Sequence, residues 1–264
     1  MASPSLAPST LATPRHALVT GGGTGIGAAV ARLLVWHGYN VTVLGRRLDK
    51  VEAVAASAPD RITAVAADVA DAAQVARAIG QATERFGPVQ VLVNNAGQAE
   101  SAPFSKMDDG LWQRMLDVNL TGTMRCIQAV LPGMVDAGWG RIVNVASTAG
   151  QIGYAYVTAY CAAKHGVVGL TRSLALELAT KGVTVNAVCP GYTDTDIVRE
   201  SIARIVAKTG RCEEAARSEF VKTNPQGRLV TPDDVAEAVA WLASNGAGSI
   251  TGQSLSVSGG EVMS

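Results

Sequence analysis

The chain is poor in aromatic and charged residues and has no long apolar run. Phe, Trp and Tyr make up 5% of its 264 residues, and charged residues make up 17% with a formal net charge of +0. A net charge of zero shows no excess of basic residues that would attract nucleic acid or an anionic membrane surface. No apolar stretch approaches the roughly 20 residues that a membrane-spanning helix needs. We therefore expect neither a nucleic-acid partner nor a membrane anchor.

Cysteine and histidine are also scarce and widely scattered. The four cysteines contain no Cys-x-x-Cys pair, and only three histidines are present. A structural zinc site needs clustered ligands of these types, so we expect no metal. Scattered cysteines suit small core positions in a reducing compartment, which predicts a cytoplasmic protein. The cysteines are Cys126, Cys161, Cys189 and Cys212.

The first fourteen residues differ in composition from the rest of the chain. Residues 1–14 are rich in Pro, Ser and Ala, and they lack both a basic segment and a long apolar run. They do not match a secretory signal peptide. The composition predicts a mobile tail over residues 1–14 and a single domain over residues 15–264.

Strand and helix patterns alternate along that domain. Several of the predicted strands are continuous apolar runs, as in parallel sheets covered on both faces. The alternation favours an α/β fold in which a doubly wound parallel sheet carries helices on both faces. Strands are predicted at 16–20, 40–44, 62–66, 89–93, 141–145, 183–188 and 254–257. Helices are predicted at 25–36, 48–56, 71–86, 109–134, 159–180 and 232–243, and the amphipathic segment 195–222 is predicted to form one or two helices as a lid.

A glycine-rich turn follows the first predicted strand. It reads Thr20-Gly-Gly-Gly-Thr-Gly-Ile-Gly27. Glycine lets a backbone turn sharply and approach a pyrophosphate, and the next helix presents N–H donors. The alternative is a turn that only packs a helix on a strand, but its place after the first strand favours dinucleotide binding. The residues predicted to bind the cofactor here are Gly21, Thr24, Gly25, Ile26 and Gly27.

The end of the second predicted strand bears on the choice between NAD and NADP. An NAD site usually has an acidic residue there for the ribose 2′-hydroxyl, whereas this chain has Arg46 and Arg47. A guanidinium can pair with a 2′-phosphate, so we predict NADP(H), with NAD(H) as the alternative and two solvated arginines as the plain interpretation. Asp68, beside Val69, could accept from the adenine amino group, or it could simply precede a helix.

A tyrosine, a lysine and a serine form the candidate chemical group. Tyr160 and Lys164 are four residues apart in a predicted helix, so they share a face. A nearby ammonium lowers a tyrosine pKa by favouring the phenolate. Ser147 follows a predicted strand at the edge where such folds bind ligands, and its hydroxyl could hold a substrate oxygen. Either motif alone is common by chance, but together with the glycine turn they predict proton transfer at a carbonyl or carbinol.

These motifs resemble the short-chain dehydrogenase/reductase family in order and spacing from about Arg15 to Gly260. The matching segments also include Asn94-Asn-Ala-Gly97, Asn119 in Val-Asn-Leu, and Pro190-Gly191. The resemblance implies a single Rossmann-fold domain with a seven-stranded parallel sheet and a homotetramer. It implies a catalytic tetrad in which Tyr160 is the acid–base, Lys164 lowers its pKa, Ser147 orients the substrate, and Asn119 holds a relay water.

The resemblance also extends the predicted cofactor site. Tyr160 and Lys164 would contact the nicotinamide ribose, and Thr193 and Thr195 would hold the carboxamide. One position departs from the family pattern, because many NADP(H) members have a basic residue where this chain has Thr24. The NADP(H) prediction therefore depends on Arg46 and Arg47 and on the missing acid. The further residues implied to bind cofactor are Asn95, Ala96, Gly97, Pro190 and Gly191, with Asn94 supporting the sheet.

Within the family the chain is most similar to 3-oxoacyl-thioester and polyketide ketoreductases. The cues are Val-Cys-Pro-Gly-Tyr-Thr-Asp-Thr, the Gly227-Arg228 turn and the Thr251-Gly-Gln ending, which many alcohol dehydrogenases share. They favour NADP(H)-dependent hydride transfer between nicotinamide and a 3-oxoacyl thioester or related ketone. The alternatives are an NAD-dependent secondary-alcohol or 3-hydroxyacyl-CoA dehydrogenase, and a dinucleotide-binding regulator without turnover. The residues predicted to contact substrate are Gln98, Gln151, Tyr154 and Tyr192, although the two tyrosines could simply pack the lid.

Overall fold

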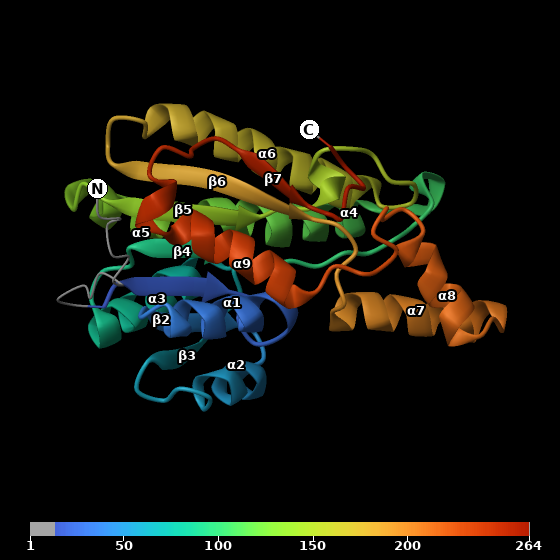
Figure 1. Cartoon of the computed structure of the whole chain (residues 1–264), viewed down its shortest axis with the longest axis horizontal. Helices are drawn as coiled ribbons and strands as arrows, with labels where there is room; N and C mark the ends of the chain where they lie inside the picture. The colour runs from blue at the N-terminus through green and yellow to red at the C-terminus, as the bar shows by residue number, and fades with distance from the viewer. Residues whose placement is uncertain (1–13, 264) are drawn as a thin grey trace, which may run out of the picture.

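Seven parallel strands form one sheet in the computed structural model, which describes residues 14–263 (Figure 1). The strand order is β3-β2-β1-β4-β5-β6-β7. Strands β2 and β3 therefore lie on one side of β1 and strands β4 to β7 on the other, and the strand order reverses between β1 and β4. Ligands of doubly wound sheets bind at this switch point, outside the carboxyl ends of the strands. Apart from Pro14, the predicted tail lies outside the described residues. The strands are β1 (His16–Thr20), β2 (Asn40–Gly45), β3 (Ile62–Ala66), β4 (Val91–Asn94), β5 (Gly140–Val145), β6 (Val183–Pro190) and β7 (Ser254–Val257).

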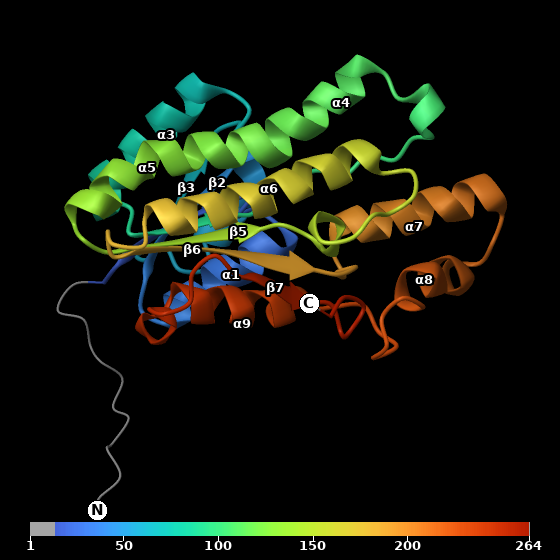
Figure 2. The ribbon, with the colours of Figure 1, turned by 90° about the horizontal axis from the view of Figure 1, so that it is seen from above.

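Helices cover both faces of the sheet (Figure 2). Along the fully buried β1, Ala17 and Val19 pack in one apolar cluster and Leu18 packs in the other. Successive strand residues face opposite sides of the sheet. When helices cover both faces, apolar residues are therefore needed at every position of a strand and not only at alternate ones. One face carries α1 (Gly25–Trp36), α2 (Leu48–Ala55) and α9 (Pro232–Ala243), and the other carries α3 (Ala72–Phe86), α5 (Gly122–Asp136) and α6 (Thr158–Glu177). The predicted doubly wound fold is confirmed.

The predicted helix over 109–134 is interrupted in the structure. It consists of α4 (Asp109–Leu116), a π-helical turn over Asp117–Thr121, and then α5. The Asn119 side-chain amide donates to the Met115 carbonyl oxygen at 2.9 Å, one turn back along the helix. A side chain that takes a helix carbonyl competes with the backbone ladder, and such turns are frequent at functional sites.

Two helices project beyond the carboxyl ends of the strands (Figures 1 and 2). They are α7 (Asp196–Thr209) and α8 (Glu213–Val221), which resolves the predicted one or two helices as two. Gly210 ends α7 at a φ of +70°, a left-handed conformation that suits glycine. The two helices share a small apolar cluster that includes Val198, Ile202 and Ala216. Whether they act as a lid stays a prediction.

Three short 3₁₀ turns complete the described secondary structure, at Phe104–Lys106, Thr148–Gly150 and Asn245–Ala247. Within residues 14–263, no helix has both the length and the apolar character to cross a membrane. In the same range, no group of three or more His, Cys, Asp or Glu side chains is arranged to hold a metal ion.

His16 is a buried histidine near the amino end of β1. Its Nδ1 lies 2.7 Å from the Gly87 carbonyl oxygen, and its Nε2 lies 2.8 Å from the Thr42 hydroxyl. Because a carbonyl oxygen only accepts, Nδ1 carries the proton, and in the neutral ring Nε2 accepts from Thr42. Burial lowers the pKa of His16 below its ordinary value of 6.5.

This burial predicts that acid destabilises the protein through His16. The folded state resists the proton that the unfolded state takes up, so the contribution is complete above pH 6.5 and declines as pH falls below it. The free energy of unfolding should decrease by up to about 1.4 kcal/mol per pH unit there. Urea unfolding at pH 7.5 and 5.5 measures the effect, with a smaller pH dependence expected for His16→Gln. The exposed His37→Gln variant is the control, and equal pH dependence in all three proteins would contradict the assignment.

Candidate functional site

The glycine turn is joined to the end of β4 by a set of hydrogen bonds. The Asn95 side-chain amide donates to the carbonyl oxygens of Thr20 and Gly21, each at 3.1 Å. The Thr20 hydroxyl accepts from the backbone N–H groups of Asn95 and Ala96, each at 3.0 Å. Asn94 instead bonds the Asn144 side chain inside the sheet at 2.9 Å. These bonds hold the turn at the β1–β4 switch point.

At two positions of the turn, the backbone conformation itself requires glycine. Gly21 has a φ of +64° and Gly25 has a φ of +52°, both in the left-handed region that side chains disfavour. A Cβ on Gly27 would lie 2.3 Å from the Gly21 carbonyl oxygen, so no side chain fits there. The Thr24 hydroxyl makes no capping bond to α1, and the first N–H groups of that helix face the turn. The turn therefore presents backbone N–H groups, rather than side chains, as hydrogen-bond donors, and we call residues 20–27 the glycine cradle.

A cavity of about 330 Å³ lies beside this cradle. Thr195 from the start of α7 reaches the same place, since a Cβ on Gly25 would lie 3.0 Å from its methyl group. The sequence-predicted cofactor residues on β1–α1 and after β6 are thus brought together across the fold. Arg32 and Arg199 also line this cavity, together with Asp194, Asp196 and Asp233, and Arg199 pairs with Asp194 at 3.0 Å. The features that fit the pyrophosphate of a dinucleotide are therefore the backbone N–H donors of the turn and the N-terminus of α1.

The ends of β2 and β3 lie side by side, because the Ala67 N–H donates to the Gly45 carbonyl oxygen at 3.1 Å. Arg46 and Arg47 follow β2 and are exposed, and the ion pairs of the described residues include neither of them. Asp68 accepts from the Ala70 N–H at 2.9 Å and does not cap α3, a role that belongs to Asp71.

Other predicted cofactor residues have structural contacts of their own. A Cβ on Gly122 would lie 2.7 Å from the Val69 methyl group, so Val69 packs against the start of α5. Ile26 packs on the apolar cluster of its own sheet face. After β6, the Thr193 hydroxyl donates to the Gly191 carbonyl oxygen at 3.0 Å. This bond keeps the segment after Pro190 turned toward the glycine cradle.

Lys164 is buried and held in one orientation. Its Nζ donates to the Val145 carbonyl oxygen at 2.8 Å, at the carboxyl end of β5. The same Nζ lies 5.7 Å from the centroid of the Tyr160 ring. A Cβ on Gly97 would lie 3.7 Å from Nζ and 2.8 Å from the Asn119 Oδ1, so Gly97 separates these two groups with no side chain. The structure therefore brings Tyr160, Lys164 and Asn119 together around the end of β4.

Burial changes the acid–base properties of this group from those expected. Burial raises the pKa of Tyr160 to about 12, and hydrogen bonding by the Ser147 hydroxyl to the tyrosine oxygen opposes the rise. Burial also lowers the pKa of Lys164 to about 8. Loss of water contact is the largest cause of the tyrosine shift, and Lys164 is not among its causes in the protein alone. That the Lys164 ammonium lowers the tyrosine pKa therefore stays a prediction.

Ser147 begins a short turn directly after β5. Its Oγ accepts from the Ala149 N–H at 3.1 Å, which fixes the side chain toward the carboxyl edge of the sheet.

A helix-interior asparagine is an ordinary pattern in sequence, but Asn119 has a specific place here. Its amide donates to the Gln98 carbonyl oxygen at 3.0 Å, and its Oδ1 accepts from the Gln98 N–H at 3.2 Å. Asn119 thus fixes the loop after β4 beside the reacting group.

The residues predicted to contact substrate fall into two sets. Tyr154 and Tyr192 meet edge to face with ring centroids 6.2 Å apart, and Tyr192 meets Phe220 of α8 at 5.0 Å. Gln151 uses both ends of its amide on β7, donating to the Ser254 carbonyl oxygen and accepting from the Ser256 hydroxyl. A direct substrate contact by Gln151 would require those bonds to break, so its role stays a prediction.

Sequence reasoning missed Glu261 entirely. Its carboxylate lies 2.7 Å from the Tyr154 hydroxyl and beside Gly191, 107 and 70 residues away along the chain. No spacing rule links a residue after the last strand to a loop between β5 and α6. The only signal in the sequence is an isolated acid after the Gly259-Gly260 pair.

Fold and site together define a class of protein. A dinucleotide cradle at the switch point of a doubly wound sheet lies next to a buried Lys and a half-buried Tyr and Ser that can hold and protonate an oxygen. This is the arrangement of a nicotinamide-dependent oxidoreductase that acts on a ketone or an alcohol. Comparison with known proteins agrees, because the family model for short chain dehydrogenases matches residues 15–205. The chain belongs to the short-chain dehydrogenase/reductase family.

Two relatives illustrate the range of named activities. The chain is 44% identical over 257 residues to a Streptomyces virginiae protein named as a ketoacyl reductase of the monensin polyketide synthase, covering 95% of this chain and 98% of that one. It is 43% identical over 249 residues to cis-4-hydroxycyclohexanecarboxylate dehydrogenase of Sinomonas cyclohexanicum, covering 93% and 96%. A solved variant of actinorhodin polyketide ketoreductase with NADPH has a TM-score of 0.90 at 38% identity, covering 94% and 97%.

Proposed function

We propose that the protein is an NADP(H)-dependent reductase of a ketone, with 3-oxoacyl thioesters and related neutral ketones as its substrate class. The observation that carries the proposal is one juxtaposition. The half-buried Tyr160, the buried Lys164 and the fixed Ser147 meet at the carboxyl end of β5. They lie beside the glycine cradle, and the end of β2 carries Arg46 and no acidic residue.

In this proposal the chain's own groups manage the oxygen of the substrate. A bound reduced nicotinamide supplies the hydride to the carbonyl carbon. The Ser147 hydroxyl donates a hydrogen bond to the carbonyl oxygen, and the Tyr160 hydroxyl donates a hydrogen bond and then its proton to the same oxygen. A raised tyrosine pKa keeps that proton in place until negative charge develops on the oxygen.

Lys164 and Asn119 complete the proton path. Lys164 loses its proton more easily than an ordinary lysine, because burial lowers its pKa to about 8. It can therefore return a proton toward Tyr160 after each turnover at neutral pH. Asn119 and Gly97 line the other side of the Lys164 ammonium, where a relay water would enter.

The NADP(H) preference is supported by electrostatics at the end of β2. A 2′-phosphate carries negative charge, and the free guanidinium groups of Arg46 and Arg47 have no carboxylate to compete for them among residues 14–263. The solved relative with NADPH adds support from a protein of the same fold. NAD-dependent oxidation of a secondary alcohol is the second candidate, favoured by the relative named as a cyclohexanecarboxylate dehydrogenase.

A substrate and cofactor panel tests the proposal. Oxidation of NADPH and of NADH is followed with acetoacetyl-CoA, ethyl acetoacetate, an aryl ketone and a cyclic ketone. We expect turnover of the thioester and the ester with NADPH in preference to NADH. Turnover confined to NADH and a cyclic ketone would contradict the proposed cofactor and substrate class and favour the second candidate.

A further inference from the structure

The short segment after β7 places the Glu261 carboxylate against Gly191 and Tyr154. Backbone bonds hold it there, since the Gly191 N–H donates to the Val257 carbonyl oxygen at 3.1 Å and the Glu261 N–H donates to the Ser258 carbonyl oxygen at 3.3 Å. A Cβ on Gly191 would lie 2.8 Å from the Glu261 Oε2. Glycine at position 191 therefore leaves the space that the carboxylate fills.

The other oxygen of this carboxylate holds Tyr154. The Tyr154 hydroxyl lies 2.7 Å from Glu261 Oε1 and 2.9 Å from the Thr148 hydroxyl. An ionised carboxylate only accepts, so Tyr154 donates to Glu261 and accepts from Thr148. Thr148 is the next residue after Ser147, so this short chain of hydrogen bonds begins beside the residue that orients the substrate oxygen.

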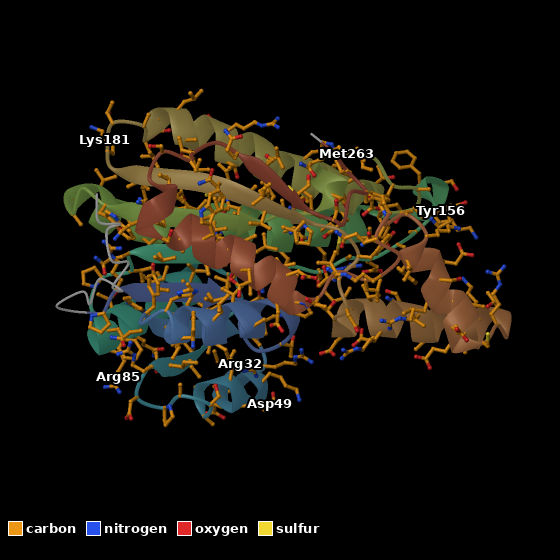
Figure 3. The ribbon with its side chains drawn as sticks, in the orientation of Figure 1. Arg32, Asp49, Arg85, Tyr156, Lys181 and Met263 are labelled. Atoms are coloured by element: carbon orange, nitrogen blue, oxygen red, sulfur yellow. The ribbon has the colours of Figure 1, made fainter. Side chains whose placement is uncertain are left out.

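Aromatic rings connect Glu261 to the reacting tyrosine. Tyr154 packs edge to face on Tyr192, and the Glu261 charge contributes to the raised pKa of both rings after burial. Tyr192 in turn is close enough to Tyr160 to contribute to its raised pKa. The loop that carries Tyr154 lies at the end of the molecule from which α7 and α8 project, as the labelled Tyr156 shows (Figure 3). Two aromatic rings, those of Tyr154 and Tyr192, thus connect Glu261 to the proton donor.

Glu261 has no basic partner within the described residues. The ion pairs formed by residues 14–263 do not include it. By contrast, Glu100 in the loop after β4 pairs with Arg114 at 3.4 Å. No Lys, Arg or His among the described residues therefore neutralises the Glu261 carboxylate beside Tyr154 and Gly191.

We propose that Glu261 is a specificity-determining residue that excludes ketones bearing a free carboxylate one methylene from the carbonyl and admits neutral esters, thioesters and aryl ketones. The inference rests on the proposed function, because it assigns a substrate class to the same site. The mechanism is repulsion between two negative charges, one of them the half-buried Glu261 carboxylate. For charges about 10 Å apart at an effective dielectric constant of about 20, this repulsion changes an equilibrium constant on the order of tenfold.

The experiment compares two ketones that differ in charge. Acetoacetate and ethyl acetoacetate share one reacting carbonyl, but only the acid is ionised at neutral pH. Glu261→Gln keeps an acceptor for Tyr154 and removes the charge, whereas Glu261→Leu removes both. Glu237→Gln, at an exposed position of α9, makes the same change of charge away from the site and serves as the control.

The wild-type protein should have a higher kcat/KM for the ester than for acetoacetate. Glu261→Gln should raise kcat/KM for acetoacetate on the order of tenfold and change the ester value by less than about threefold. Glu237→Gln should leave the ratio of the two values unchanged. Glu261→Leu should lower both values, because Tyr154 loses its hydrogen-bond acceptor and the aromatic wall is no longer held in place.

An unchanged ratio in Glu261→Gln, or an equal change for both ketones, would overturn the proposal. If the wild-type protein reduces neither ketone, the proposed function fails, and calorimetric binding of acetoacetate to the NADPH-loaded proteins still decides the inference. Tighter binding of acetoacetate to Glu261→Gln than to wild type would support charge exclusion. Equal binding would overturn it.

Discussion

Tyr160→Phe is expected to lower kcat for ketone reduction about 10³-fold while leaving NADPH binding and the fold intact. The change removes one hydroxyl, which is the proton donor to the developing oxyanion. General acid catalysis contributes about 10²- to 10⁴-fold, so its loss is the largest single effect predicted for this chain. The half-buried ring stays in place because Phe retains the packing of Tyr160 against the apolar cluster of Leu111, Met115 and Ala159.

The measurement is single-turnover NADPH oxidation together with calorimetric NADPH binding. Single turnover separates the chemical step from product release. Tyr156→Phe is the control, because Tyr156 is 66% exposed and four residues before Tyr160. A Tyr160→Phe protein with near wild-type kcat would show that another group donates the proton. A loss of NADPH binding equal to the loss of rate would assign Tyr160 to cofactor binding instead.

Arg46→Ala is expected to weaken NADPH binding about 10- to 100-fold and to leave NADH binding nearly unchanged. A hydrogen bond to a charged group contributes about 1.5–3 kcal/mol, and about 1.4 kcal/mol corresponds to a factor of ten. Only NADPH carries the 2′-phosphate that the guanidinium would bind. Fold stability should not change, because the exposed Arg46 forms no ion pair among the described residues.

Dissociation constants for NADPH and NADH, measured at two salt concentrations, test this prediction. Screening weakens exposed charge pairs, so the NADPH constant of the wild type should depend on salt more than that of Arg46→Ala. Arg85→Ala is the matched control, since Arg85 lies at the end of the molecule opposite α7 and α8 (Figure 3). Equal weakening of both cofactors by Arg46→Ala would mean that Arg46 does not read the 2′-phosphate.

Local patterns were enough to predict the main elements of the fold. Apolar runs in β1 and the alternation of strands with helices indicate a sheet covered on both faces, because strand residues must be apolar at both parities there. The glycine turn was equally readable, since the positive φ of Gly21 and Gly25 demands that residue type. Helix boundaries were less predictable where side chains take over backbone bonds, as Asn119 does in the π-helical turn.

The functional group was predictable only in part. Tyr160 and Lys164 lie four residues apart, so helix geometry alone places them on one face. Their acid–base behaviour was not predictable, because the pKa of Tyr160 depends on burial by segments that are distant in sequence. The contacts of Gln151 were not predictable either, because its side chain forms hydrogen bonds with Ser254 and Ser256 of β7, which lie far away in the sequence.

The sequence by itself determined the class of fold, the dinucleotide cradle and the residue types that carry the chemistry, because each depends on neighbours within a few positions. Only the tertiary structure decided how distant segments share the site. It joined Asn95 to the glycine turn, set Thr195 against Gly25, and placed Glu261 on Tyr154. These contacts depend on the order of the strands in the sheet, which brings the ends of β1, β4, β5 and β6 to one edge.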